Sequence, residues 1–171
     1  MILTGVMDGP LSGGTKVLEI YVYEDIPDLS LYGVGLANNG GGTDGQEFTF
    51  PAVSANAGDR FFIASESTEF TAFFGEAPDY TSNAMGINGD DAIELFLNGV
   101  VIDLYGDINV DGNGETWEYV DGYSVRTGGT AGAYVDGNYS HNNGALDALD
   151  EAAQAAALGG AFSNFNVVPE P

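Results

Sequence analysis

The stretch that decides the fold reads Asp91-Ala-Ile-Glu-Leu-Phe-Leu97, then Asn98-Gly99, then Val100-Val-Ile-Asp-Leu-Tyr105. The Asn-Gly dipeptide accepts the two positive φ angles of a type I′ turn, the connection that suits the twist of a tight β-hairpin. The flanking runs are rich in aliphatic and aromatic residues, as strands usually are. The stretch therefore predicts a hairpin with strands at residues 91–97 and 100–105.

Further short strands are expected on both sides of this hairpin. Leu18, Ile20 and Val22 alternate with Glu and Tyr residues, which is the period of two typical of a half-buried strand. Other strand candidates, each bounded by turn residues, lie at 30–36, 47–50, 60–65 and 161–168. Residues 38–45 contain so much Gly and Asn that they predict a loop, because few side chains remain to pack.

Two segments are expected to be helical. Residues 69–75 place Phe70, Phe73 and Phe74 at helical spacing and predict a single turn that packs against one end of the core. The alanine-rich residues 145–158, stopped by Gly159-Gly160, predict the only longer helix, which would lie on the sandwich edge. Many short strands with one late helix predict an all-β protein built as a β-sandwich.

The composition describes one strongly acidic domain. The chain has 171 residues, enough for a single domain with a core, and 44% of them are hydrophobic. It carries 26 acidic residues against three basic ones, Lys16, Arg60 and Arg126, for a formal net charge of −23. This charge argues against nucleic acid and anionic membrane surfaces as partners, since both require clustered basic residues, and it favours cations.

Several expectations about compartment follow from the same composition. No cysteine is present, so neither disulfides nor thiolate metal sites are available. No run approaches the roughly 20 apolar residues that span a bilayer, and we expect no membrane insertion. Residues 1–4 do not resemble the start of a signal peptide, which fits either a cytosolic protein or a secreted one whose leader has been removed. The acidic, glycine-rich and lysine-poor composition favours a secreted or cell-surface protein.

The residues that follow the hairpin match a calcium-binding loop. Residues 107–118 read Asp-Ile-Asn-Val-Asp-Gly-Asn-Gly-Glu-Thr-Trp-Glu and fit the pattern D-x-[DN]-x-[DN]-G-x5-E at every specified position. Calcium takes about six to eight oxygen ligands, and such a loop supplies them at regular spacing around a glycine turn, here Gly112. The predicted calcium ligands are Asp107, Asn109, Asp111, Asn113, Glu115 and Glu118.

The same residue types also form calcium-free surface turns, because Asp and Asn cap their own backbone and tolerate left-handed conformations. Gly114 stands where helix-loop-helix sensors usually have an aliphatic residue. The preceding residues 100–105 have a strand pattern, and residues 118–126 are short and aromatic. We therefore expect calcium ligation on a connection between strands and not within a helix-loop-helix unit.

Several motifs in this region resemble bacterial lamin-tail domains. In those sequences an aspartate pair opens a central hairpin, and a D-x-N-x-D-G segment precedes a Trp-Glu dipeptide. The matching residues here are 88–95, 98–103, 105–112 and Trp117-Glu-Tyr119. Thr4-Gly5-Val6, Asp8-Gly9-Pro10 and residues 19–22 also resemble the first strands of the family. The resemblance covers residues 2–126 and extends more loosely to residue 162.

This resemblance implies an immunoglobulin-like β-sandwich in residues 1–166, with one short C-terminal helix, followed by a tail at 167–171. Lamin-tail domains occur in secreted bacterial proteins, alone or beside hydrolases and nucleases, usually as non-catalytic modules. The alanine-rich helix departs from the family, which more often has a loop of small polar residues there. Val168-Pro169-Glu170-Pro171 is similar to the start of an exosortase sorting signal, and it also suits a plain extended tail.

Classical catalytic motifs are missing from the sequence, and we expect no enzyme activity. His141 is the only histidine and stands in a turn-like context, which suits a surface residue. Neither a nucleophile elbow, nor a Walker loop, nor an H-E-x-x-H motif is found. A glycosidase that uses two carboxylates remains an alternative, since a chain with so many acids will bring some pair to a suitable separation.

Two non-catalytic functions remain open. The first is a calcium-binding structural or adhesive module of the cell surface or extracellular matrix, which could assemble with itself through edge strands and the terminal segments 2–6 and 162–168. In the alternative, these segments complete the sheets of a monomer. The second function is a polysaccharide-binding module with an aromatic stacking face, although the same residues could form a ladder that stabilises a sheet. These aromatic residues are Tyr21, Tyr23, Trp117, Tyr119 and Tyr123.

Overall fold

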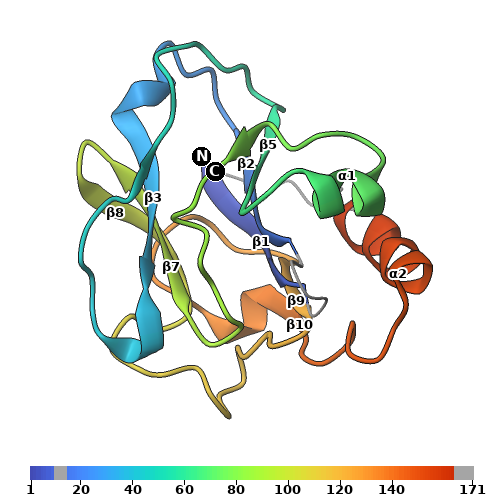
Figure 1. The fold of residues 1–171 in the computed structure, drawn as a ribbon. Coiled ribbons are helices and arrows are strands. Elements are labelled where there is room, and N and C mark those ends of the chain that lie inside the picture. Colours follow the sequence, from blue (N-terminus) through green and yellow to red (C-terminus); the bar gives the residue numbers. More distant parts are fainter. Residues whose placement is uncertain (10–14, 164–171) are drawn as a thin grey trace.

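The computed structural model describes residues 1–9 and 15–163, with backbone alone for Glu151 and residues 159–163. Two β-sheets pack face to face, and two helices cover the outer side of the larger sheet (Figure 1). The predicted all-β sandwich with one short C-terminal helix is confirmed. The predicted boundary at residue 166 and the tail at 167–171 lie outside the described residues.

Within residues 1–9 and 15–163, ten strands make up the two sheets. The larger sheet contains, in spatial order, β10 (Tyr139–Asn142), β9 (Tyr123–Arg126), β1 (Ile2–Asp8), β2 (Lys16–Tyr21), β5 (Arg60–Ala64) and β6 (Tyr80–Thr81). The smaller sheet contains β4 (Phe48–Thr49), β3 (Tyr32–Ala37), β7 (Ala92–Leu97) and β8 (Val100–Tyr105). Neighbouring strands are antiparallel except β5 and β6, which run parallel.

The predicted hairpin forms the centre of the smaller sheet. Asn98 and Gly99 have φ angles of 52° and 75°, as a type I′ turn requires. The register pairs Leu97 with Val100, and a bulge follows between Leu95 and Phe96. On its other side β7 pairs along its whole length with β3, so this strand is interior to the sheet.

The first strand takes a more central place than the sequence predicts. β1 lies between β2 and β9 in the larger sheet, and all of its residues are buried. Leu3 and Val6 face the space between the sheets, whereas Met7 packs on the helical side. The N-terminal segment 2–6 therefore pairs within the chain's own sheet. This is the arrangement expected if the segment does not pair with a second copy of the chain.

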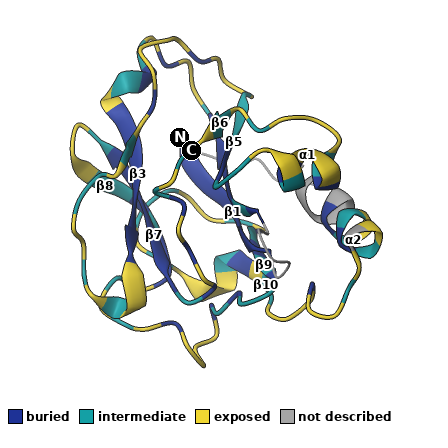
Figure 2. Ribbon diagram, viewed as in Figure 1, coloured by how far each residue is buried: buried dark blue, intermediate teal, exposed yellow. Residues whose placement is uncertain are grey.

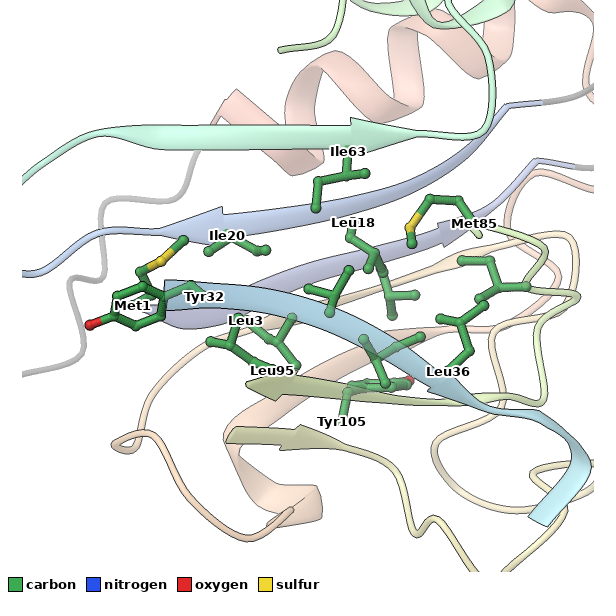
Figure 3. Close-up of a cluster of buried hydrophobic side chains, with 14 of the residues drawn as sticks. Met1, Leu3, Leu18, Ile20, Tyr32, Leu36, Ile63, Met85, Leu95 and Tyr105 are labelled. Carbon is green, nitrogen blue, oxygen red and sulfur yellow. The ribbon is translucent and has the colours of Figure 1, made fainter. Parts of the chain in front are cut away.

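The main hydrophobic core fills the space between the two sheets. Leu18, Ile20 and Ile63 of the larger sheet are fully buried against Leu36 and Leu95 of the smaller one. Figure 3 shows these side chains interdigitating, with Met1, Tyr32 and Met85 closing the layer. The buried residues accordingly follow the two facing sheets (Figure 2).

A second hydrophobic cluster joins the helices to the larger sheet. In α1 (Thr68–Phe74), Phe70 and Phe73 are buried against Met7 and Ala64, so the predicted aromatic turn is core packing. The helix α2 (Glu151–Ser163) lies beside α1 and adds Leu158 to this cluster. In the part of the chain that the structure describes, no helix is both long and apolar enough to span a bilayer.

The C-terminal helix is displaced from its predicted position. It begins at Glu151 and not at residue 145, because residues 143–148 form turns in which Ala148 has a φ of +57°. The Asp150 carboxylate accepts a hydrogen bond of 2.9 Å from the Ala153 N–H and caps the new start. The helix continues through Gly159-Gly160 to Ser163. The predicted strand at 161–168 is therefore wrong for residues 161–163, and its remainder lies outside the described residues.

One buried ion pair connects the two sheets. The Arg126 guanidinium of β9 donates two hydrogen bonds, of 2.9 and 2.8 Å, to the Asp103 carboxylate of β8. Arg126 Nε also donates to the Leu3 carbonyl at 2.7 Å, and the Leu3 N–H donates to Asp103 Oδ2 at 2.8 Å. Burial raises the pKa of Asp103, and Arg126 with the N–H groups of Leu3 and Gly132 opposes that rise.

Replacing Arg126 with Leu is expected to lower the free energy of unfolding by about 3–5 kcal/mol, because Asp103 would remain buried without its counter-charge. Urea denaturation followed by tryptophan fluorescence measures the loss. Arg126→Lys keeps the charge but loses the two-pronged contact, so its expected loss is intermediate. A loss below about 1 kcal/mol for Arg126→Leu would contradict this role of the ion pair.

A second buried carboxylate, Glu19 of β2, lies on the helical side of the larger sheet. Its Oε2 accepts a hydrogen bond of 2.9 Å from the Thr4 hydroxyl, and its Oε1 lies 3.1 Å from Arg60 Nη1. The Glu19 side chain is fully buried, whereas the Arg60 side chain is 27% exposed. Burial therefore outweighs both partners and raises the pKa of Glu19 to about 7.

Because the pKa of Glu19 is raised from 4.5 to about 7, the folded state binds this proton more tightly than the unfolded state. Its contribution favours folding below pH 4.5 and is lost as the pH rises towards about 7. We expect Glu19→Gln to gain stability relative to the wild type across this window, by about 3 kcal/mol at most. Urea titrations at a series of pH values measure the difference. A difference between Glu19→Gln and the wild type that does not change with pH would contradict the prediction.

Candidate metal-binding loop

The loop at residues 107–118 connects β8 to the segment that leads into β9, so a strand precedes it and no helix follows it directly. It is folded by consecutive tight turns. The Asp107 and Asp111 carboxylates accept backbone hydrogen bonds from Asn109 and Asn113 at 2.9 and 3.0 Å, and the Glu115 N–H donates to the Gly112 carbonyl at 2.9 Å. These are the self-capping turns that Asp and Asn favour in either a metal loop or a metal-free turn.

A glycine anchors the middle of the loop to the body of the protein. The Gly112 N–H donates to the Asp90 carbonyl at 3.0 Å, and the Trp117 ring packs directly over Gly112. A Cβ at this position would lie 2.6 Å from the Trp117 ring and 2.7 Å from the Asp90 oxygen. Trp117 is itself buried, and its carbonyl accepts a hydrogen bond of 2.5 Å from the Tyr105 hydroxyl.

A second loop packs against the first. The Gly42 N–H donates to the Ile108 carbonyl at 2.8 Å, and Gly40 lies so close that a Cβ there would be 2.5 Å from the Asp111 nitrogen. Gly40 also has a φ of +70°, which favours glycine. The glycine-rich loop predicted at 38–45 thus supports the candidate metal loop, although the sequence did not indicate this contact.

The structure places the six predicted ligands on one loop without gathering its carboxylates around a point. Five of the side chains are exposed, and Glu118 is half-buried, with its Oε2 accepting a hydrogen bond of 2.7 Å from Asn143. Within residues 1–9 and 15–163, no three Asp, Glu or His side chains are grouped closely enough to hold a metal ion. The six ligands remain a prediction: Asp107, Asn109, Asp111, Asn113, Glu115 and Glu118.

Two further carboxylates contribute negative charge at this end of the molecule. The pKa of Asp90 is raised by burial and then by the charges of Asp91, Asp111 and Glu118. The pKa of Asp91 is also raised by burial, against hydrogen bonds that it accepts from the Asn39 and Asn88 N–H groups at 3.0 and 3.1 Å. Mutual repulsion of these carboxylates favours a cation nearby.

The only histidine takes part in a network that the sequence did not predict. Ser124 Oγ lies 2.9 Å from His141 Nδ1, and His141 Nε2 lies 3.3 Å from Asp136 Oδ1. His141 is half-buried and is not the surface residue that its turn-like context suggested. The chain of contacts from serine to histidine to aspartate resembles a hydrolase triad. Ser124 is fully buried, however, and its Oγ accepts a hydrogen bond of 2.8 Å from the Tyr105 hydroxyl. A substrate therefore cannot reach this serine in the described fold.

The aromatic residues considered for polysaccharide stacking do not form one exposed face. Trp117 and Tyr119 belong to the core, with 4% and 0% of their surface exposed, and Tyr21 is also buried. Tyr119 donates from its hydroxyl to the Asp91 carbonyl at 3.0 Å, so it fixes the acidic end of the sandwich. Trp117, Tyr119 and Tyr21 therefore stabilise the fold from the interior, whereas Tyr23 and Tyr123 are half-buried.

Comparisons with protein-family models, with curated proteins and with solved structures find no match to this chain.

Replacing Gly112 with Ala is expected to destabilise the loop and lower the melting temperature, because the new Cβ would collide with the Trp117 ring and the Asp90 carbonyl. We expect a loss of about 1–3 kcal/mol in thermal or urea unfolding. Gly128→Ala is the matched control, since open space surrounds Gly128 and its φ is not in the left-handed region. Equal stability of the two variants would show that Gly112 does not anchor the loop.

Proposed function

We propose that this protein is a non-catalytic, calcium-binding module of the cell surface or extracellular matrix, with the ion held by loop 107–118. The observation that carries the proposal is the complete match of this loop to a calcium-binding pattern. In the fold, the loop is anchored at Gly112 and supported by Gly40, so its backbone is positioned before an ion arrives. Such preorganisation lowers the entropic cost of binding.

Electrostatics give the same proposal a second support. The chain has a formal net charge of −23, and Asp90, Asp91, Asp111 and Glu118 act on one another at the loop end. A divalent cation there would reduce the repulsion between carboxylates. Because the unfolded chain lacks the assembled loop, binding would stabilise the folded state in proportion to the free calcium concentration.

The non-catalytic part of the proposal is supported by the state of a serine that contacts a histidine in the described fold. Ser124, His141 and Asp136 contact one another in sequence as the residues of a hydrolase triad do, yet Ser124 of β9 is fully buried and already hydrogen-bonded to Tyr105. The resemblance to lamin-tail domains and the acidic composition support placement outside the cell. A polysaccharide-binding function receives less support, because Trp117 and Tyr119 are in the core.

The double variant Asp107→Ala/Asp111→Ala is expected to lose most of the calcium-dependent rise in melting temperature, because it removes two predicted carboxylate ligands. Titration calorimetry of metal-stripped protein measures binding directly, up to millimolar calcium. Terbium luminescence sensitised by Trp117 offers a local readout, since this ring packs on Gly112 inside the loop.

The matched control is Glu76→Ala/Asp147→Ala, which removes two exposed carboxylates from outside the loop. This control should retain the calcium response of the wild type. If the loop variant and the control respond alike to calcium, or if no saturable binding to loop 107–118 occurs, the proposed calcium role of the loop is wrong.

A further inference from the structure

Most buried carboxylates in this protein have an evident partner. Asp8, Glu19 and Asp103 are nearly or fully buried, and each forms an ion pair with one of the three basic residues of the chain. Lys16 pairs with Asp8, Arg60 with Glu19, and Arg126 with Asp103. The buried Asp91 instead accepts hydrogen bonds from two backbone N–H groups. No lysine or arginine therefore remains for another buried acid.

Glu94 is such an acid. Its side chain is 0% exposed, and neither carboxylate oxygen has a partner in good hydrogen-bond geometry, although the Thr43 hydroxyl lies nearby. Among the residues that the structure describes, it is the one carboxylate whose two oxygens are both buried and unpartnered. Burying a charged group without compensation is very costly, so the group must either bind a proton or meet a cation.

The position of Glu94 on β7 directs it away from the main core. Its neighbours Ile93 and Leu95 pack between the sheets, and successive strand residues point to opposite faces. Glu94 thus projects from the outer face of the smaller sheet, opposite Gly35 on β3 and Leu104 on β8. Something other than the larger sheet must cover it.

The cover is the segment at residues 43–47, which lies flat on this face because β3 contributes glycines. A Cβ at Gly35 would be only 2.2 Å from the Gly45 carbonyl oxygen, and one at Gly33 would be 2.3 Å from the Gln46 side chain. Glu47 Oε2 accepts a hydrogen bond of 2.8 Å from the Leu36 N–H, which fixes the segment to the strand. The covering segment brings oxygen atoms close to Glu94.

The groups near Glu94 offer oxygen atoms as possible metal ligands, and two of them, Asp44 and Glu47, carry negative charge. Burial raises the pKa of Glu94 most, the Thr43 hydroxyl opposes that rise, and the charges of Asp44 and Glu47 raise the pKa further. Thr43, Asp44 and Glu47 are exposed, so polar side chains of this one segment lie between Glu94 and the solvent on this face.

We propose that Glu94 is the buried ligand of a second calcium site, closed from the solvent side by Thr43 and Asp44. Calcium binds carboxylates with one or both oxygens and accepts hydroxyl, carbonyl and water oxygens to complete its shell. The site uses none of the residues of loop 107–118. The Glu94 site can therefore be tested independently of the calcium role proposed for that loop.

The test starts from the loop variant Asp107→Ala/Asp111→Ala, in which the first site is disabled. Titration calorimetry of metal-stripped protein with calcium should show one remaining saturable site in this background. Adding Glu94→Gln, which keeps the size of the side chain but removes its charge, should abolish that site. Adding Glu76→Gln, which removes one negative charge from an exposed position, should leave the remaining site intact.

Glu94→Leu guards against a folding defect in the glutamine variant, because a buried leucine needs no hydrogen-bond partner. In chelator, this variant should melt at or above the wild-type temperature, and in calcium it should bind one ion fewer. If Glu94→Leu and Glu94→Gln bind as many calcium ions as their parents, the proposal is overturned and Glu94 is simply a protonated acid. If the loop variant binds no calcium while the wild type does, the Glu94 site is likewise excluded.

Discussion

The scarcity of positive charge constrains the whole structure. With three basic residues in 171, each cation is committed to a buried or nearly buried carboxylate, and the Arg126–Asp103 pair is placed between the two sheets. This pair also hydrogen-bonds to the N–H and to the carbonyl of Leu3, so it fixes β1, β8 and β9 together. The remaining carboxylates must be satisfied by backbone N–H groups, by protons or by external cations.

The acidic end of the sandwich illustrates this constraint. The loops at residues 38–42, 88–91 and 107–118 meet there. They are joined by hydrogen bonds to backbone N–H groups, and Gly40 and Gly112 allow their close approach. The side chains left free to face solvent are mostly Asp, Asn and Glu. A cation-binding surface is the chemical role for which such an end is suited, because oxygen ligands are dense and competing ammonium groups are missing.

Local patterns predicted the parts of the fold that depend on local chemistry. The Asn98-Gly99 turn and the alternation in β2 were sufficient for those elements. The start of α2 depended instead on the Asp150 cap and on the left-handed turn at Ala148, and β1 could not be placed because both of its faces are buried. The loop motif was evident in the sequence, whereas the support from Gly40 and the burial of Glu94 arise only from tertiary packing.

The central position of β1 has a consequence for the order of folding. The first strand of the chain hydrogen-bonds through Leu3 to groups that lie 100 and 123 residues later. β9 is therefore synthesised long after β1, which until then can pair only with its neighbour β2. Such non-local pairing makes folding slow, and it leaves one edge of an apolar strand open to association with other chains in the meantime.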